Sequence, residues 1–560
     1  MSAGVWKEQV ADKRKRQQEA IPPEWRYIDL PSNDQLNVLD VPATCGLLTP
    51  LELEITNVSD VSVLLKQLAS AQWSSVQVTT AFCKRAVIAH QLTNCLTEIF
   101  FARALDRAAE LDEYLKQHGT VMGPLHGLPI SLKDQFCVKG LETVMGYAAW
   151  IGKVAAENAV LVDLLLDCGA VLYVRTNLPQ TLMWAETNNN VFGRTVNPYN
   201  RNFAAGGSSG GEGSLIAMHG SILGAATDVA GSIRIPAHFC GIYGFKPSAH
   251  RIPSYGISDA LDGQDSIPTC IGPLSSSLSG LMVFFQAVLS KQPWRRDPRT
   301  LNKPWDQDAY MLKGQNEGEQ LCFGLLWNEG TITPTPPVNR ALEQTKAALE
   351  KAGHIVINWE PFKHKEFYVN ARAIWTSDGY ADYRASVNTG EPLLHSMKPD
   401  ADPSDVPPHR RPREPLSSFD VWQLNKERRE LRKAHLDYWE SSITRTGTGR
   451  PVDALICPGG PYPAVPHGHA RPSFYTWMWN SLDYPVLAIP VTKVDASQDV
   501  KPPPHKFLSA DDEGVYQLYD PVLFDGLPVG IQVMCPTQHE EMLLAIGKIV
   551  DKSLHDIGKQ

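Results

Sequence analysis

The sequence has 560 residues, of which 43% are hydrophobic and 20% are charged, and its formal net charge at pH 7 is −9. These values are typical of a soluble globular protein, and the acidic balance argues against nucleic acid or an anionic membrane as a partner. Because no run of about 18 apolar residues occurs, we expect no membrane span and a cytoplasmic protein.

The first predicted element is an amphipathic helix near the N-terminus, over residues 6–20. It carries the basic run Lys13-Arg14-Lys15-Arg16. A run of this kind usually lies on a solvated helix face, and we interpret it in that way.

Further along the chain, hydrophobic periodicity predicts alternating helices and strands. Helices are expected over 61–71, 74–90, 104–116, 159–168, 338–352 and 540–550. Strands are expected over 95–100, 130–132, 170–174, 354–359, 485–494 and 529–534. Gly169 and Gly353 each end a helix directly before a strand, a step that builds parallel sheets. The pattern therefore predicts an α/β protein with a sheet covered by helices.

Three other regions attract attention without indicating a site by themselves. Residues 391–415 and 495–515 are rich in proline and are interpreted as surface excursions. The aromatic run 474–480 would either pack inward or wall a pocket. No metal site is expected, because the histidines lack a third ligand at convincing spacing: His467, His469 and His505.

The most informative region is 206–232, GGSSGGEGSLIAMHGSILGAATDVAGS, in which Ser208 and Ser232 each follow glycine. A phosphate-binding loop would need Gly-Lys-Ser/Thr, whereas Glu212 follows the glycines here. A hydrolase elbow formally fits G-x-S-x-G but must follow a hydrophobic strand, and turn-forming residues 197–202 precede it. A glycine-rich structural loop without chemistry is a third interpretation.

A second unusual residue is Lys133, which closes the short apolar run 130–132. Its ammonium group would lose hydration in a buried strand, so a buried lysine there calls for an explanation. The residues alone leave the roles of Lys133, Ser208 and Ser232 open.

Residues 206–247, which end in GSIRIPAHFCGIYGFKP, closely resemble the signature of the amidase signature family of serine hydrolases. The upstream letters GPLHGLPISLKD, which include Lys133, look like the lysine motif of that family. The segments TNLPQ, FGRTVNP and GLPVGIQ are also similar to family segments. The likeness covers most of the chain, is weakest over 280–450, and is greatest to the fungal acetamidase-type branch.

The resemblance implies a fold and a domain organisation. The fold is a single large α/β domain with a central twisted mixed β-sheet covered by helices. Residues 1–60 would form an N-terminal helical arm, and 61–560 would form the amidase signature domain. Within that domain we expect a catalytic core, a variable insert and a C-terminal return to the core: 95–280, about 280–450 and 451–560.

The resemblance also implies the site residues. Ser232 would be the nucleophile, Ser208 the bridging serine after a cis peptide bond, and Lys133 the base. The backbone amides of four residues would form the oxyanion hole: Val229, Ala230, Gly231 and Ser232. Three residues would border the substrate, namely Met183, Trp184 and Gly207. Four others would brace the loops: Ser209, Thr227, Asp228 and Arg234.

The implied activity is hydrolysis of a small-molecule carboxylic amide to an acid and ammonia or an amine, without metal or cofactor. An esterase or acyltransferase of the same fold, or a glutaminase-type subunit of an amidotransferase, are the alternatives. A homodimer is a further implication. Lysine can act as the base only when neutral, so its pKa must fall by roughly three units from its usual value near 10.4. One departure from the family, Ala230 where glycine is common, keeps an N–H donor.

Overall fold

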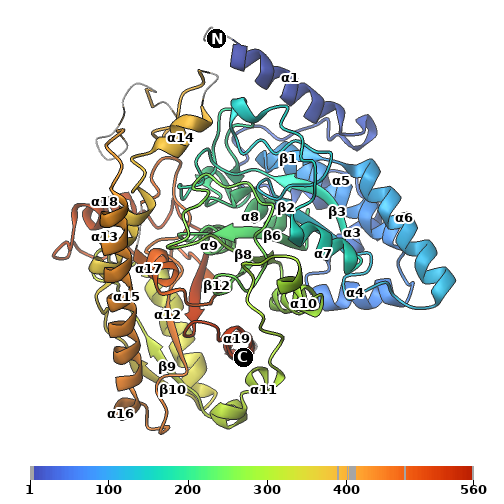
Figure 1. The fold of residues 1–560 in the computed structure, drawn as a ribbon. Helices are drawn as coiled ribbons and strands as arrows, with labels where there is room; N and C mark the ends of the chain where they lie inside the picture. Colours follow the sequence, from blue (N-terminus) through green and yellow to red (C-terminus); the bar gives the residue numbers. More distant parts are fainter. Residues whose placement is uncertain are drawn as a thin grey trace.

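The computed structural model describes residues 5–387, 390–399, 401–402, 406, 411–471 and 474–557. One eleven-stranded sheet runs through the molecule, with helices packed around it (Figure 1). Strands from the N-terminal half form one part of this sheet and strands from the C-terminal half form the other (Figure 1). Antiparallel pairing of β7 (Tyr243–Lys246) with β12 (Val486–Lys493) joins the two parts.

The sheet is mixed, because parallel triplets near both ends flank antiparallel pairs in the middle. This confirms the predicted fold class. The strands, in their spatial order, are β1 (Leu96–Ile99), β3 (Val171–Thr176), β2 (Pro129–Lys133), β6 (Leu223–Asp228), β8 (Cys270–Ser275), β7, β12, β13 (Pro528–Met534), β11 (Ala454–Pro458), β9 (Cys322–Leu325) and β10 (Ile355–Asn358).

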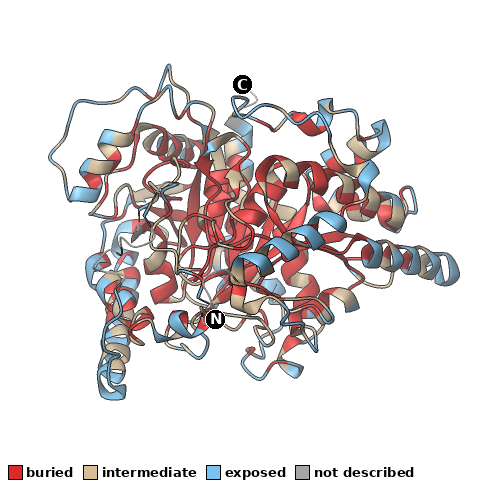
Figure 2. Ribbon diagram, turned by 90° about the horizontal axis from the view of Figure 1, so that it is seen from above, coloured by how far each residue is buried: buried red, intermediate tan, exposed pale blue. Residues whose placement is uncertain are grey.

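The helices cover this sheet, and Figure 2 shows the strands buried while the outer helix faces are exposed. The helices are α1 (Val5–Glu19), α2 (Val41–Thr44), α3 (Pro50–Asn57), α4 (Val61–Ala69), α5 (Ser75–Thr93), α6 (Phe101–His118), α7 (Val160–Asp167), α8 (Gly210–Ala217), α9 (Arg234–Cys240), α10 (Leu278–Ser290), α11 (Gln307–Tyr310), α12 (Pro336–Lys351), α13 (His364–Trp375), α14 (Ala381–Ser386), α15 (Ser418–Ser441), α16 (Ile443–Thr446), α17 (Phe474–Leu482), α18 (Ala510–Leu518) and α19 (Glu540–Ile557). In the described part of the chain, no helix is both long enough and apolar enough to cross a bilayer.

Local sequence signals explain where several elements begin and end. Ser74 caps α5 through a capping box with Gln77, which satisfies backbone N–H groups that the first turn leaves unpaired. Gly169 adopts a φ of +88° between α7 and β3, and Gly353 a φ of +91° between α12 and β10. Both predicted helix-to-strand steps are therefore confirmed.

The prediction of a solvated basic face on α1 is wrong for Lys13. Its side chain is buried and pairs with Glu98 and with Glu142. Arg14 donates to Phe192 O at 3.1 Å. Lys15, with 73% of its side chain exposed, and Arg16, with 43%, match the expected solvated positions. The helix is thus fastened to the domain through a cation that compensates two acidic side chains.

Two predictions about loops also need correction. A hairpin of β4 (Val196–Asn197) and β5 (Asn200–Ala204) precedes the glycine-rich loop where we expected only turn residues. Its strands form a separate sheet. Residues 495–515 are not wholly irregular either, since Ser509 caps α18 and satisfies the amide of Asp512.

Candidate active site

Lys133 lies at the end of β2, between the parallel strands β3 and β6. Its side chain is fully buried, and its Nζ donates to Ser208 Oγ at 2.7 Å and to Thr227 Oγ1 at 2.8 Å. Burial lowers the pKa of Lys133 to about 7, because the ammonium form loses its hydration. A neutral amine at this position is therefore accessible near neutral pH.

Thr227 lies at the end of the neighbouring strand β6. Its hydroxyl donates to Gln135 Oε1 at 2.5 Å and accepts from Lys133. A hydroxyl has one proton, so a Thr227 that donates to Gln135 can only accept from the lysine. This pair of bonds fixes the direction of the lysine amine, and Gln135 is a contributor that the sequence did not indicate.

The loop between β5 and α8 carries Ser208, and its Gly207–Ser208 peptide bond is cis. Gly207 leaves no room for a side chain, because an added Cβ would lie 2.5 Å from Trp184 O and 2.7 Å from Glu186 N. Ser209, on the far side of Ser208, is buried, and its Oγ lies 3.4 Å from the carbonyl oxygen of Thr227, to which it donates.

Glu212, in the first turn of α8, ties this loop to the sheet. It accepts from Ser131 Oγ at 2.6 Å and from Thr176 Oγ1 at 2.9 Å. Burial raises the pKa of Glu212 to about 7. Its contacts are hydroxyl groups of β2 and β3, so α8 is held against the strand that carries Lys133.

Asp228 and Arg234 form a buried pair that encloses the loop bearing Ser232. Arg234 donates through Nε and Nη2 to the two carboxylate oxygens, each at 3.0 Å. The same oxygens accept from the amides of Gly231, at 2.8 Å, and Ile233, at 3.1 Å. Burial alone would raise the pKa of Asp228, but the Arg234 guanidinium holds it well below its usual range. The carboxylate thus clamps the backbone on both sides of Ser232.

The loop from Val229 to Ser232 adopts a backbone conformation that requires glycine at position 231. Gly231 has a φ of +128°, and an added Cβ would lie 2.7 Å from Thr476 Oγ1. Ala230 is not among the residues with positive φ, so its methyl group is accommodated without strain. The Gly231 amide already donates to Asp228, which distinguishes it from the other amides of the expected oxyanion hole.

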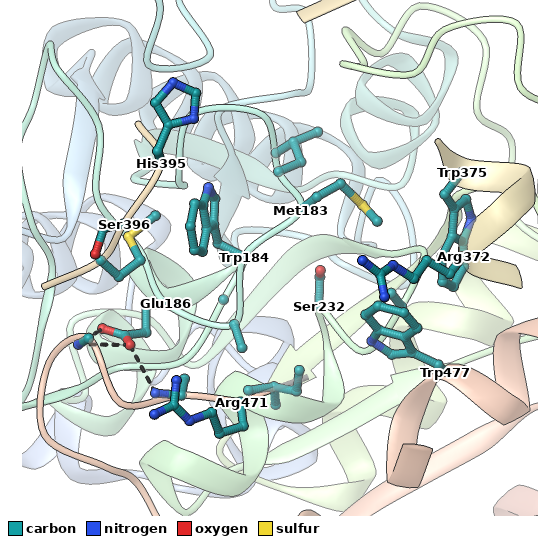
Figure 3. Close-up of a pocket in the computed structure, with 18 of the residues that line it drawn as sticks. Met183, Trp184, Glu186, Ser232, Arg372, Trp375, His395, Ser396, Arg471 and Trp477 are labelled. Atoms are coloured by element: carbon teal, nitrogen blue, oxygen red, sulfur yellow. Dashed lines mark hydrogen bonds between the residues drawn. The ribbon is translucent and has the colours of Figure 1, made fainter. Parts of the chain in front are cut away.

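Ser232 borders a cavity of about 940 Å³. The cavity wall includes Met183, Trp184, Gly207 and Ala230, which the sequence analysis also named. Figure 3 shows Met183 and Trp184 beside Ser232. Lys133, Ser208 and Thr227 lie behind this wall in one hydrogen-bonded group. The structure therefore gathers the named residues into one region, with the two serines on the loops that adjoin the cavity.

Most of the opposite cavity wall was missed by the sequence analysis. It comes from lining residues within 368–383, within 395–398 and 401–402, and within 468–471 and 476–477. Part of the proline-rich region 391–415 thus lines the cavity and does not merely form a surface excursion; its residues 400, 403–405 and 407–410 lie outside the described residues. The residues of the aromatic run 474–480 have different environments. Trp477 lines the cavity, whereas Tyr475 and Trp479 are buried.

The histidines that attracted attention make ordinary contacts. His467 Nε2 lies 3.1 Å from Arg201 O, and His505 Nε2 lies 3.1 Å from Asp512 Oδ2. Across the described ranges, no three His, Cys, Asp or Glu side chains are grouped as metal ligands would be.

Comparison with known proteins relates this geometry to enzymes. A family model described as "Amidase" matches residues 77–544. The chain is 39% identical to an acetamidase of Aspergillus oryzae over 556 residues, which is 99% of this chain and 100% of that protein. It is 40% identical to an acetamidase of Emericella nidulans, covering 99% of each chain.

Solved structures share the fold. A fatty acid amide hydrolase superposes with a TM-score of 0.89 and 32% identity, covering 98% of this chain and 95% of that one. A peptide amidase from Stenotrophomonas maltophilia superposes with a TM-score of 0.67 and 21% identity, covering 90% and 98% of the two chains.

Proposed function

This chain belongs to the amidase family and is a hydrolase of carbon–nitrogen amide bonds, and we propose that it acts through an acyl-enzyme on Ser232. Lys133 is the base and Ser208 transfers the proton between Lys133 and Ser232. The substrate is a small-molecule carboxylic amide that enters the cavity beside Ser232.

The proposal for the base rests on burial and contact. A serine hydroxyl is a weak nucleophile near neutral pH and needs a base within hydrogen-bond reach. The lysine amine lies 2.7 Å from Ser208 Oγ, and its pKa of about 7 makes the neutral form available. When neutral, its nitrogen has a lone pair that accepts the Ser208 proton while an N–H still donates to Thr227.

The bond changes follow from these positions. Ser232 Oγ attacks the amide carbonyl carbon, and its proton passes to Ser208, whose own proton passes to Lys133. As the tetrahedral intermediate collapses, the C–N bond breaks and the proton returns through Ser208 to the leaving nitrogen. Water then attacks the acyl-enzyme by the same route and releases the carboxylic acid.

The oxyanion that forms on the carbonyl oxygen needs fixed hydrogen-bond donors, for which we propose backbone amides of the loop 229–232 other than that of Gly231. Gly231 contributes mainly through its bond to Asp228, which fixes the loop. The neighbouring amides of Ala230 and Ser232 then face the acyl group. Such donors stabilise the charge because they need no rearrangement when it develops.

The observation that carries this proposal is the 2.7 Å contact between buried Lys133 and Ser208, next to a cavity that Ser232 lines. The test is to treat the protein with a fluorophosphonate probe and to locate the adduct by peptide mass spectrometry. We expect the adduct on Ser232, and none in Ser232→Ala. An adduct on another serine, or full amide hydrolysis by Ser232→Ala, would contradict the assignment.

Two further expectations from the sequence remain part of the proposal: a homodimer and a cytoplasmic location. Light scattering on the eluting peak of a gel-filtration column would measure the first. Fractionation of expressing cells would measure the second.

A further inference from the structure

One wall of the cavity is formed by α13. Tyr368, Arg372 and Trp375 lie four and three residues apart, so they share one face of this helix, and all three line the cavity. Trp477, from α17, meets the same face. Sequence analysis considered Trp477 as part of an aromatic run but not its partners on α13, which lie about a hundred residues earlier in the chain.

The rings of this wall contact one another. Tyr368 stacks on Trp477 with ring centroids 4.7 Å apart and planes 16° apart. Trp375 meets the other part of Trp477 edge-on, with centroids 5.1 Å apart and planes 86° apart. We call Tyr368, Trp375 and Trp477 the aromatic wall. Such contacts hold the rings in fixed positions and present a flat apolar surface to a ligand.

The aromatic wall adjoins the loop of the proposed nucleophile. Trp375 belongs to a buried cluster against which Val229, Ala230 and Trp477 pack. Met183, which Figure 3 draws beside Ser232, packs against the same cluster. A molecule with one group on the aromatic wall therefore lies in the cavity that Ser232 also borders, next to the loop that carries this serine.

Arg372 adds a positive charge to this apolar surface. Its side chain points from α13 into the cavity, on the side of Ser232 (Figure 3). It hydrogen-bonds the Tyr368 hydroxyl. Among the described residues, no carboxylate lies within ion-pair distance of its guanidinium. A phenol uses only a small part of the five N–H donors of an arginine.

The neighbouring acids of the cavity have other partners. Glu186 accepts from the amides of Gly468 and Ala470 and pairs with Arg194 at 3.3 Å. Asp511 lies 3.8 Å from Arg471. Apart from tyrosines, the remaining ionisable lining groups are His395, Lys398 and Asp402, which lie on the stretches 395–398 and 401–402. Arg372 is thus the cation that stands beside the aromatic wall.

The volume of the cavity bears on the size of the substrate. At about 940 Å³ it lies in the upper part of the range of sites for drug-sized ligands. A short aliphatic amide would leave most of this space filled with water and would not touch the wall. A larger molecule with a flat apolar portion would displace that water.

Resting on the proposed function, we propose that the substrate is an amide bearing both a planar hydrophobic group and a carboxylate. The ring lies on the aromatic wall, and the carboxylate binds the Arg372 guanidinium. Arginine suits this role because its planar fork matches two carboxylate oxygens and also stacks against rings.

The experiment compares substrates that differ in charge but little in shape. The first pair is the N-acetyl derivatives of 4-aminophenylacetate and 4-isobutylaniline, which place the variable group on the amine side. The second pair is 4-(carboxymethyl)phenylacetamide and 4-isobutylphenylacetamide, which place it on the acyl side. A methylene group separates the carboxylate from the ring in each acid, so the reactivity of the amide changes little.

We expect the native enzyme to prefer the carboxylate member of at least one pair, in kcat/KM, by roughly ten- to a hundredfold. Arg372→Gln should lose this preference and Arg372→Glu should reverse it. Lys365→Gln is the matched control, since Lys365 is on the exposed face of α13 and away from the cavity. It should keep the native preference. Added salt should weaken the preference of the native enzyme.

Binding to Ser232→Ala, measured by calorimetry, separates this proposal from the proposed function. Tighter binding of the carboxylate member that is lost in Ser232→Ala/Arg372→Gln would support the proposal even if no amide were hydrolysed. Equal binding of both members in both pairs, or a preference that survives Arg372→Gln, would overturn it. Failure of Ser232 to react with fluorophosphonate would count against the proposed function alone.

Discussion

Thr227 accepts a hydrogen bond from Lys133 while it donates its own proton to Gln135. Because the single proton of the Thr227 hydroxyl goes to Gln135, Thr227 accepts a hydrogen bond from the lysine amine and does not donate one to it. The hydrogen bond to Thr227 orients the amine and leaves its contact with Ser208 in place. It also makes Thr227 a positioning residue whose effect can be measured.

Thr227→Val removes this acceptor while keeping nearly the same shape. We expect kcat to fall by roughly ten- to a hundredfold, because the lysine loses one of two contacts that orient it. The hydroxyl also favours the charged amine, so its loss should move the inflection of the kcat/KM profile to lower pH. Thr227→Ser keeps the hydroxyl and should recover most of the activity. Unchanged pH profiles in both variants would contradict the role.

The pH dependence of the native enzyme tests the lysine directly. Lys133 acts as a base only when it is deprotonated, and burial lowers its pKa to about 7. We therefore expect kcat/KM to rise about tenfold per pH unit below the inflection and to level off above it. Lys133→Arg should be inactive throughout, because a guanidinium stays protonated. A flat profile between pH 5 and 9 in the native enzyme would contradict the assignment.

Asp228→Asn tests the clamp around Ser232. The substitution leaves the buried Arg234 guanidinium without a carboxylate, and it places an NH2 group where the surrounding groups are all donors. We therefore expect the free energy of unfolding to fall by about 3–5 kcal/mol. Urea titration measures the change, and fluorophosphonate labelling of Ser232 should slow in parallel. Asp437→Asn is the control, since Asp437 pairs with Lys433 at the surface and about 0–1 kcal/mol is expected there.

Lys13→Met tests how α1 is attached. The partly buried side chains of Glu98 and Glu142 would lose the buried ammonium group that is their nearest cation, which predicts a loss of about 3 kcal/mol in the free energy of unfolding. Lys15→Met on the same helix removes an exposed ammonium group and should change little. Equal stability of the two variants would mean that the pairing is not required.

The sequence indicated the sheet and the residues near the two serines because their signals are local. Gly353 ends α12 because glycine readily adopts a positive φ. Lys133 is conspicuous because a lysine ends an apolar run. Other features depend on chain segments that meet only in the folded protein. Lys13 looked solvated because its partners Glu98 and Glu142 are distant in sequence. Arg372 and Trp477 likewise gave no sign of a shared wall, because helical periodicity reports burial and not which cavity a face borders.

The pairing of β7 with β12 has an evolutionary consequence. Lys133, Ser208 and Ser232 are carried by the N-terminal part of the sheet, whereas α13 and α17 belong to the C-terminal part. The residues proposed for the reaction and the recognition surface proposed on α13 and α17 are thus encoded by different stretches of the gene. If both proposals hold, mutations in the second stretch change which amide is bound while the residues proposed for the chemistry in the first stretch stay unchanged.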